Sequence, residues 1–329
     1  MSSLSVVSIR TPDLVLANPT AGGGLAQDAL PRLRKFASEQ RWSVEFRSAA
    51  SSAEFAQRAC EEVAAGRERI FALGGDGTFQ VLLNAVAGNP QVSIGVLPAG
   101  GGNDLASALG LPQDVVQAAE ALLLRGEVSC LDAAHVRTSD GVERLYMGGG
   151  GVGLDAEAAR FASGVYRKIR GRGRYLLSAV RALWRFQPMD TRIMLEDPTE
   201  KLLETKALVV AVLNTPSYGA GVRLAPDADL QDGKLDLVIV ENLNALEIVR
   251  ALAQLAASGE IHSKHVQRRS IQRVRIETDI PCVFHADGEI IGRTPVEIAV
   301  VRRAMRVWHL PWKDKQTSVP PGKFSLRNQ

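Results

Sequence analysis

The sequence has few cysteines and no cysteine motif. Its three cysteines, Cys60, Cys130 and Cys282, lie far apart, and no C-x-x-C pair occurs among them. Small disulfide-stabilised proteins carry densely spaced cysteines, usually in even number, and thiolate zinc sites need close pairs. The pattern therefore excludes both kinds of framework, and it favours a reducing, cytoplasmic environment.

Long hydrophobic runs are also missing. The best candidate, Ala207 to Leu213, is far shorter than the roughly 20 apolar residues that a transmembrane helix needs. Residues Met1 to Ile9 lack a basic start followed by a long apolar run, so no secretory signal is predicted. We therefore expect the protein to approach any membrane from the aqueous side, as a peripheral protein.

The chain has no large excess of one charge. Charged residues make up 23% of the sequence and the formal net charge is +3, which excludes a disordered chain and a protein that binds nucleic acid by bulk charge. The length of 329 residues exceeds what one hydrophobic core usually serves. Two domains are therefore expected.

Two patterns of secondary structure divide the chain. Residues 1–127 alternate short apolar runs with helical periodicity, which predicts a parallel sheet covered by helices. Residues 128–302 read mainly as strands, which predicts a β-sandwich with helical insertions near 154–186 and 244–258. Asp-Gly pairs at 140, 232 and 287 predict hairpin turns in this part.

Two glycine-rich loops directly follow predicted strands. Gly74-Gly75-Asp76-Gly77-Thr78 precedes a helix, so its backbone N–H groups and the helix N-terminus favour an anion such as phosphate. Thr78 is a donor for a phosphate oxygen, and Asp76 is placed to face a phosphate-bound Mg²⁺. The second loop is Pro98 to Asp104, in which Asn103 is expected to hold the loop or a ribose and Asp104 to cap the next helix. No Walker A loop is present.

A further glycine cluster lies at the start of the β-rich part. Gly148, Gly150 and Gly153 satisfy G-x-G-x-x-G, but they do not follow the first strand of a βα unit. The chain about 20 residues later reads Arg172-Gly173-Arg174, where a dinucleotide site needs an acidic residue. We interpret these glycines as sites of close packing or backbone curvature.

Two acidic turns and one basic stretch can each be interpreted either as ordinary structure or as a functional site. Asp287-Gly288-Glu289 is either a plain hairpin or a catalytic turn. Residues 229–234 form either a hairpin or an oxygen-ligand site for Mg²⁺ or Ca²⁺. Residues 160–174 carry basic side chains interleaved with aromatic ones and no acidic residue, which suits either a solvated loop or an anionic membrane surface. Its docking candidates are Arg167, Lys168, Arg170, Arg172 and Arg174.

These motifs, in this order along the chain, resemble those of a known family. Asn18-Pro19 with Gly22 to Gly24, GGDGT, PAGGGNDLA at 98–106, APDADLQDGKLDL at 225–237 and Asp287-Gly288-Glu289 are similar to bacterial lipid kinases of the diacylglycerol kinase catalytic-domain family. Ceramide and sphingosine kinases are relatives. The resemblance implies a phosphofructokinase-like nucleotide domain, completed by residues 303–329, and a C-terminal β-sandwich, with ATP between them.

The resemblance also implies roles for individual residues. Asp287 is the expected general base, with Glu289 beside it to hydrogen-bond it or help hold Mg²⁺ through water. Asp229, Asp232 and Lys234 match a structural cation site. The expected nucleotide-binding residues are Asn18, Arg47, Gly74, Gly75, Asp76, Gly77, Thr78, Phe79, Gln80, Gly101, Asn103 and Asp104. Two of these depart from the family, because Gly101 and Arg47 each occupy a position where it usually has threonine.

The expected activity is transfer of the ATP γ-phosphate to a lipid hydroxyl at a membrane surface. We expect no nucleic-acid partner, and a homodimer is one option for the oligomeric state. An NAD kinase shares GGDG and the nucleotide domain, and a nucleotide-sensing module would keep the loops without turnover. Soluble NAD as acceptor leaves the basic aromatic stretch unexplained, and a sensor has no need of Asp287.

Overall fold

The computed structural model describes residues 11–153, 187–196, 201–219, 221–243 and 263–312, with 247 and 254 as single positions. The helical insertions expected at 154–186 and 244–258 lie outside these residues, apart from the two single positions. So do the C-terminal residues from 313 onward.

Helices alternate with strands in the N-terminal part of the chain, as expected. Its elements are β1 (Asp13–Ala17), the 3₁₀ turn η1 (Ala21–Gly23), α1 (Leu25–Glu39), β2 (Val44–Ser48), α2 (Ser52–Ala64), β3 (Arg69–Gly74), α3 (Asp76–Val86), β4 (Ser93–Pro98), α4 (Asp104–Ala108) and α5 (Val115–Arg125). Local sequence explains several boundaries. Ser51 caps α2 by accepting the Glu54 N–H, and Asp114 caps α5.

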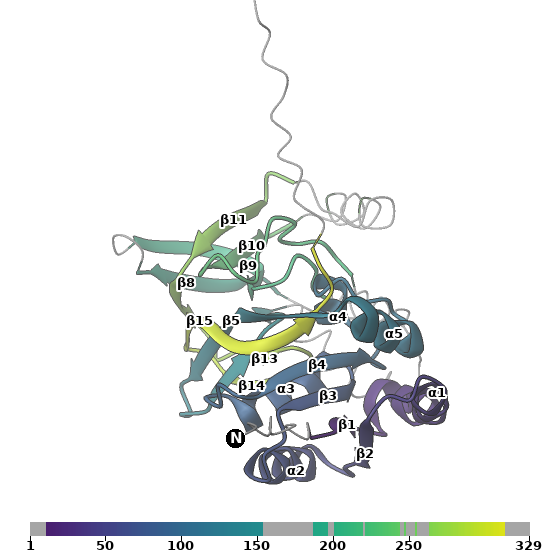
Figure 1. Cartoon of the computed structure of the whole chain (residues 1–329). Coiled ribbons are helices and arrows are strands. Elements are labelled where there is room, and N and C mark those ends of the chain that lie inside the picture. The colour runs from purple at the N-terminus through teal and green to yellow at the C-terminus, as the bar shows by residue number, and fades with distance from the viewer. Residues whose placement is uncertain are drawn as a thin grey trace, which may run out of the picture.

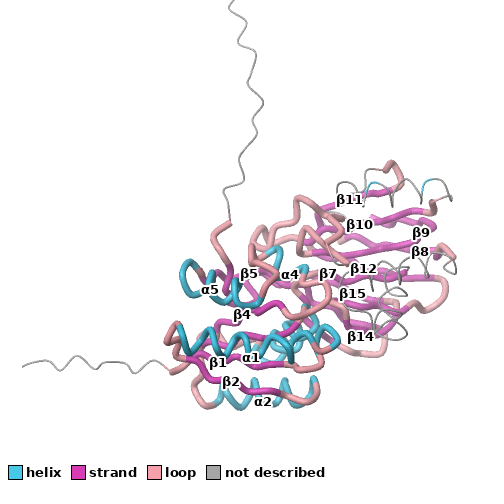
Figure 2. Tube along the Cα trace, turned by 90° about the vertical axis from the view of Figure 1, so that its right-hand side faces the viewer, coloured by secondary structure: helices cyan, strands magenta, loops and turns pink. Residues whose placement is uncertain are grey.

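Strands dominate the rest of the described chain. They are β5 (Glu127–Thr138), β6 (Glu143–Tyr146), β7 (Gly149–Gly153), β8 (Met189–Leu195), β9 (Lys201–Leu213), β10 (Leu235–Glu241), β11 (Val266–Ile271), β12 (Arg273–Thr278), β13 (Val283–Ala286), β14 (Glu289–Arg293) and β15 (Val296–His309). Figure 1 shows these strands above the helical part, and Figure 2 shows the helices gathered around β1, β2 and β4.

All described strands join one 15-stranded sheet. Strands β4, β3, β1 and β2 lie side by side and parallel, whereas the C-terminal strands pair antiparallel in a sandwich-like arrangement. The last strand serves both parts: Val296 to Val301 pair with β5, while Arg306 and Val307 pair in parallel with β4. This return of β15 to the N-terminal part of the chain, called the nucleotide half below, is the connection that the resemblance predicted. The domain boundaries at residues 127 and 302 stay a prediction.

Strand alternation explains the continuous apolar runs of β9 and β10. In β9, Val210 and Val212 enter one core cluster while Val209, Ala211 and Leu213 enter another on the opposite face. A strand covered on both faces needs apolar residues at every position rather than at every second one. A third cluster unites β1, β3 and β4 with their helices.

Several strands were not anticipated from the sequence. Strand β7 consists of the glycine run itself, and its register is set by β9 on one side and β13 on the other. The hairpins at Asp140-Gly141 and Asp287-Gly288 are confirmed. The hairpin at Asp232-Gly233 is wrong: this turn ends the long connection from β9 to β10, where the Gly233 N–H donates to the buried Asp132 carboxylate over 2.7 Å.

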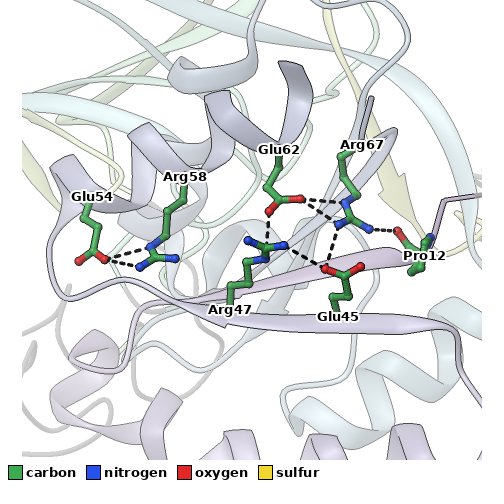
Figure 3. A network of polar contacts seen from close by, with 7 residues as sticks. All are labelled: Pro12, Glu45, Arg47, Glu54, Arg58, Glu62 and Arg67. Carbon is green, nitrogen blue, oxygen red and sulfur yellow. Dashed lines mark hydrogen bonds and ion pairs between the residues drawn. The ribbon is translucent and has the colours of Figure 1, made fainter. Parts of the chain in front are cut away.

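A buried ion-pair network joins β2, α2 and the start of β1 (Figure 3). The Arg67 guanidinium pairs with Glu62 at 2.9 Å and with Glu45 at 3.0 Å, and it donates to the Pro12 carbonyl. Arg47 reaches the other Glu62 oxygen at 2.9 Å. Glu62 and Arg67 are only 6% and 9% exposed, so each charge depends on the other for compensation.

Replacing Arg67 with alanine should therefore destabilise the protein by about 3 kcal/mol, because a buried Glu62 carboxylate would lose its main partner. The measurement is urea unfolding followed by circular dichroism. Arg58→Ala is the matched control, since Arg58 pairs with Glu54 on the same helix in an exposed position. Equal losses in both variants would show that the network adds nothing beyond a surface pair.

Candidate active site

One cavity lies between the helical part and the strand-rich part. Its volume is about 380 Å³, and both glycine-rich loops and the Asp287 turn line it. From the N-terminal part it is lined by Asn18, Thr20, Ala21, Gly22, Gly23, Ser52, Gly75, Asp76, Gly77, Thr78, Gly100, Gly101, Gly102 and Asp104. From the C-terminal part it is lined by Gly148, Gly149, Ser217, Tyr218, Gly219, Asp287, Gly288 and Glu289.

The two glycine-rich loops touch each other in the cavity floor. They follow β3 and β4, which are adjacent parallel strands, so both loops emerge at the same sheet edge. A Cβ on Gly100 would lie 2.5 Å from the Gly75 Cα. Only glycine permits this approach, and the contact leaves the N-terminus of α3 open to the cavity as an anion site.

Asp76 and Asp104 connect the loops rather than standing free. The Asp76 carboxylate accepts the N–H groups of Asp104 and Leu105 at 3.2 and 3.1 Å. It is therefore Asp76, and not Asp104 as expected, that satisfies the first turn of α4. Asp104 instead accepts the Gly221 N–H at 2.7 Å, which ties the β9–β10 connection to the nucleotide half. Burial, with the nearby charges of Asp104 and Asp287, raises the pKa of Asp76 to about 7.

Asp287 is a buried carboxylate held by three backbone donors. Its Oδ1 accepts the N–H groups of Gly148 and Gly149 at 3.0 Å each, and its Oδ2 accepts that of Met147 at 3.1 Å. Its backbone is left-handed, with φ 49°, as the hairpin turn requires. Burial raises the pKa of Asp287 to about 6, although the three N–H groups act in the opposite direction.

The backbone around this carboxylate has no room for side chains. A Cβ on Gly148 would lie 2.6 Å from Asp287 Oδ1, and one on Gly77 would lie 2.8 Å from Glu289 Oε1. Gly77 therefore lets the phosphate loop of one half meet the acidic turn of the other. Burial also raises the pKa of Glu289. The site thus places two carboxylates, Asp287 and Glu289, opposite the glycine-rich loop at residues 74–78.

Comparison with known proteins agrees with this geometry. The diacylglycerol kinase catalytic domain matches residues 12–136, and the YegS C-terminal NAD kinase beta sandwich-like domain matches residues 149–309. Residues 12–136 are therefore a diacylglycerol kinase catalytic domain.

Curated relatives carry the same family name. A diacylglycerol kinase of Mycobacterium tuberculosis is 29% identical over 245 residues, covering 74% of this chain and 78% of the relative. One of Bacillus subtilis strain 168 is 29% identical over 297 residues, covering 89% and 94%. A crystal structure from Bacillus anthracis str. Sterne superposes with a TM-score of 0.74 at 22% identity, covering 94% of this chain and 99% of that chain. At that identity the superposition supports the fold alone.

Most of the nucleotide-binding residues expected from the family line the cavity. These are Asn18, Gly75, Asp76, Gly77, Thr78, Gly101 and Asp104. Gly74 ends β3, and Phe79 and Gln80 are buried behind the loop, where the Gln80 amide donates to the Ala286 carbonyl at 3.3 Å. Asn103 holds the second loop by accepting the Gly100 N–H, as expected. Their contacts with nucleotide remain predictions.

Arg47 lies apart from the cavity lining. Its guanidinium pairs with Glu45 and Glu62 in the network of Figure 3, on β2. The family's threonine position is thus filled by a side chain that has ion-pair partners elsewhere. A direct contact between Arg47 and nucleotide would require it to leave both carboxylates.

The structure describes the predicted cation site but not the predicted membrane-docking stretch. Asp229 and Asp232 accept the N–H groups of Gln231 and Lys234, as turns commonly do, and no cluster of three acidic, histidine or cysteine side chains suited to a metal occurs among the described residues. The family resemblance suggests a cation held by one carboxylate together with backbone carbonyls, and this site stays a prediction. The basic stretch at 160–174 lies outside the described residues.

Sequence reasoning missed the groups that hold Asp287. From sequence, Gly148 is interpreted as a site of close packing or curvature, and Met147 and Gly149, the other two donors, are not singled out. The run Gly148 to Gly151 was the available signal, because consecutive glycines in a strand indicate close approach of another group.

Gly148→Ala should lower turnover by roughly 10²-fold, because the new Cβ displaces the carboxylate from its donors and small misplacements are costly in catalysis. ATP affinity should remain unchanged. The measurement is steady-state kinetics alongside nucleotide titration. Gly292→Ala is the control, since a Cβ there would also crowd a carboxylate oxygen, Asp140 Oδ1 at 2.9 Å, but outside the cavity lining. Normal turnover in Gly148→Ala would mean that the donors do not position Asp287.

Proposed function

We propose that this protein transfers the γ-phosphate of ATP to a hydroxyl of a lipid such as a diacylglycerol or a related glycerolipid or sphingolipid. The observation that carries the proposal is the position of Asp287 across the cavity from the phosphate loops. Phosphoryl transfer depends on positioning and on charge stabilisation, and only the acceptor hydroxyl needs a base. The cavity has a group for each of these tasks.

The charge of the cavity supports a divalent metal. Asp76, Asp104, Asp287 and Glu289 line it, and no lysine or arginine occurs among the described lining residues. A triphosphate would be repelled by these carboxylates unless a cation lay between them, and oxygen ligands suit Mg²⁺. Bound Mg²⁺ would supply compensation for the charge of the phosphates, and we propose that Asp76 faces it while Glu289 reaches it through water.

The protein's own groups divide the remaining work. Backbone N–H groups at the start of α3 bind phosphate oxygens, and Thr78 donates from the same loop. Asp287 accepts the proton of the lipid hydroxyl at Oδ2, which has one backbone donor where Oδ1 has two. With a pKa of about 6, the carboxylate is ionised at neutral pH and is more basic than an exposed aspartate.

The lipid is proposed to be reached from a membrane surface. None of the described helices is long and apolar enough to cross a bilayer. Docking through Arg167, Lys168, Arg170, Arg172 and Arg174 remains part of the proposal and rests on sequence alone.

Radiolabelled ATP with a panel of lipid alcohols and NAD tests the function. Asp287→Asn should keep the fold and the ATP affinity but lose roughly 10²-fold or more in turnover with the best lipid, because amide nitrogen and oxygen cannot take the proton. His285→Gln should lose much less. NAD as the best acceptor, or near-normal turnover in Asp287→Asn, would contradict the proposal.

The pH dependence gives a separate test. The base must be ionised, so kcat/KM should fall as pH falls through about 6, where free Asp287 gains its proton. Asp76 titrates in the same region, with a pKa of about 7, so the acid limb belongs to both groups. A limb near pH 4, the range of an exposed carboxylate, would show that the base is not the buried aspartate.

A further inference from the structure

One face of helix α3 connects the glycine-rich loop at residues 74–78 to the strands that carry and hold Asp287. The helix begins within that loop. Gly77, Gln80 and Asn84 are spaced three and four residues apart, so they lie along one face of the helix. A Cβ on Gly77 would lie 2.8 Å from Glu289 Oε1 and 3.4 Å from the Asp287 carbonyl oxygen. This face of α3 is therefore turned toward the strand-rich part.

Asn84 bonds to the backbone of β6 as a neighbouring strand would. Its Oδ1 accepts the Leu145 N–H at 2.9 Å, and its Nδ2 donates to the Leu145 carbonyl at 2.8 Å. The same Nδ2 donates to the Gln80 carbonyl within α3, also at 2.8 Å. A backbone N–H only donates and a carbonyl only accepts, so these partners leave one orientation for the amide. The side chain thus fixes one turn of α3 against one residue of β6.

Leu145 lies just before the backbone that holds the Asp287 carboxylate. A single residue separates it from Met147, and Met147, Gly148 and Gly149 supply the three N–H groups that Asp287 accepts. A shift of Leu145 relative to α3 would move these donors with it, because they belong to the same short stretch of chain. The position of Asp287 therefore depends on the contact that Asn84 makes.

Gln80 contacts the strand of Asp287 itself. Its Nε2 donates over 3.3 Å to the carbonyl of Ala286, the residue before Asp287, and the side chain is buried. One turn of α3 thus contacts both the strand that carries the carboxylate and the strand that leads to its donors. The start of the same helix is the anion site described above. The helix consequently determines how far a phosphate at that site lies from Asp287.

We propose that Asn84, with Gln80 as a second contact, is a positioning residue that sets the distance between the phosphate-binding loop and the Asp287 base. This inference rests on the kinase function proposed above. Asn84 lies outside the cavity lining, so it acts through Asp287 and the loop rather than on a substrate. It is half-buried, so water can take the place of the amide when the side chain is shortened.

Asn84→Ala tests this role by separating turnover from nucleotide affinity. The kcat with the best lipid acceptor should fall about 10-fold, because small misplacements of reacting groups are costly in catalysis. The Kd for ATP should not change, since the glycine-rich loop keeps its own contacts. Asn89→Ala is the matched control: Asn89 donates to the Val86 carbonyl at 2.9 Å at the end of the same helix, and its loss should leave kcat unchanged. A normal kcat in Asn84→Ala would overturn the proposal.

A double-mutant cycle with Asp287→Asn distinguishes positioning from a general loss of structure. If Asn84 acts by placing Asp287, Asn84→Ala should cost less than about 2-fold once residue 287 is asparagine, because residues that act as a unit are not additive. Radiolabelled ATP makes the residual turnover measurable. A further loss of about 10-fold in that background would show that Asn84 merely supports the fold, and the proposal would be wrong.

Gln80→Leu takes the place of Asn84→Ala in the cycle if Asn84→Ala does not fold. It removes the donor to the Ala286 carbonyl and should lower kcat about 5-fold with Asp287 present and hardly at all with Asp287→Asn. An equal loss in both backgrounds would count against positioning. If Asp287→Asn itself keeps near-normal turnover, the proposed function fails. If Asp287→Asn loses turnover but Asn84→Ala does not, only the positioning role fails.

Discussion

The buried Asp287 carboxylate and its three backbone donors impose the main constraint on this structure. A carboxylate removed from water is costly unless its oxygens are hydrogen-bonded. Here Met147, Gly148 and Gly149 supply the bonds from the start of β7. A Cβ on Gly148 would collide with the Asp287 carboxylate, and Cβ atoms on Gly149 and Gly150 of β7 would collide with neighbouring side chains. The left-handed backbone of Asp287 belongs to the hairpin turn. The same bonds join β13 and β7 at the point where the cavity needs a proton acceptor.

The second constraint is negative charge on both sides of one cavity. Asp76 and Asp104 come from the nucleotide half, and Asp287 and Glu289 come from the strand-rich half. Burial, followed by the nearby charges of Asp104 and Asp287, raises the pKa of Asp76 to about 7. Backbone N–H groups satisfy most of this charge in the protein itself. The remaining negative charge is what the metal–nucleotide complex proposed above would compensate.

Shared apolar packing, hydrogen bonds and strand pairing join the two parts of the chain, since the core cluster of the helical part also includes Leu131, Ala133 and Met147. Gly221 donates to Asp104, Gln80 donates to the Ala286 carbonyl, and β15 pairs with both β4 and β5. The strand supplies a rigid connection, whereas the hydrogen bonds lie at the cavity itself. This arrangement fixes the register of the two loops relative to Asp287 while leaving the cavity open for a nucleotide and a lipid headgroup.

Local sequence was sufficient for the first half of the chain and for the phosphate loops. The apolar runs before Gly74 and Pro98, with helix signals after them, determine two adjacent βα units, and their loops must then share one sheet edge. The turn at Asp287 was equally readable, because Asp-Gly between strands is a local signal. The β7 strand was not readable, since glycine has no strand preference. The Asp-Gly signal at Asp232 predicted a turn but wrongly predicted a hairpin, because this turn is held by Asp132, far away in sequence.

By itself, the sequence determined the alternating strands and helices of the first half, the two glycine-rich loops and the candidate base. Only the tertiary structure decided which groups meet: Asp76 with the first turn of α4, Gly77 with Glu289, Gly148 with Asp287, and Tyr218 with His285. The physical reason is the distance along the chain over which each effect acts. Propensity and periodicity act over a few residues, whereas hydrogen bonds and close packing between distant segments depend on strand register, which no local pattern specifies.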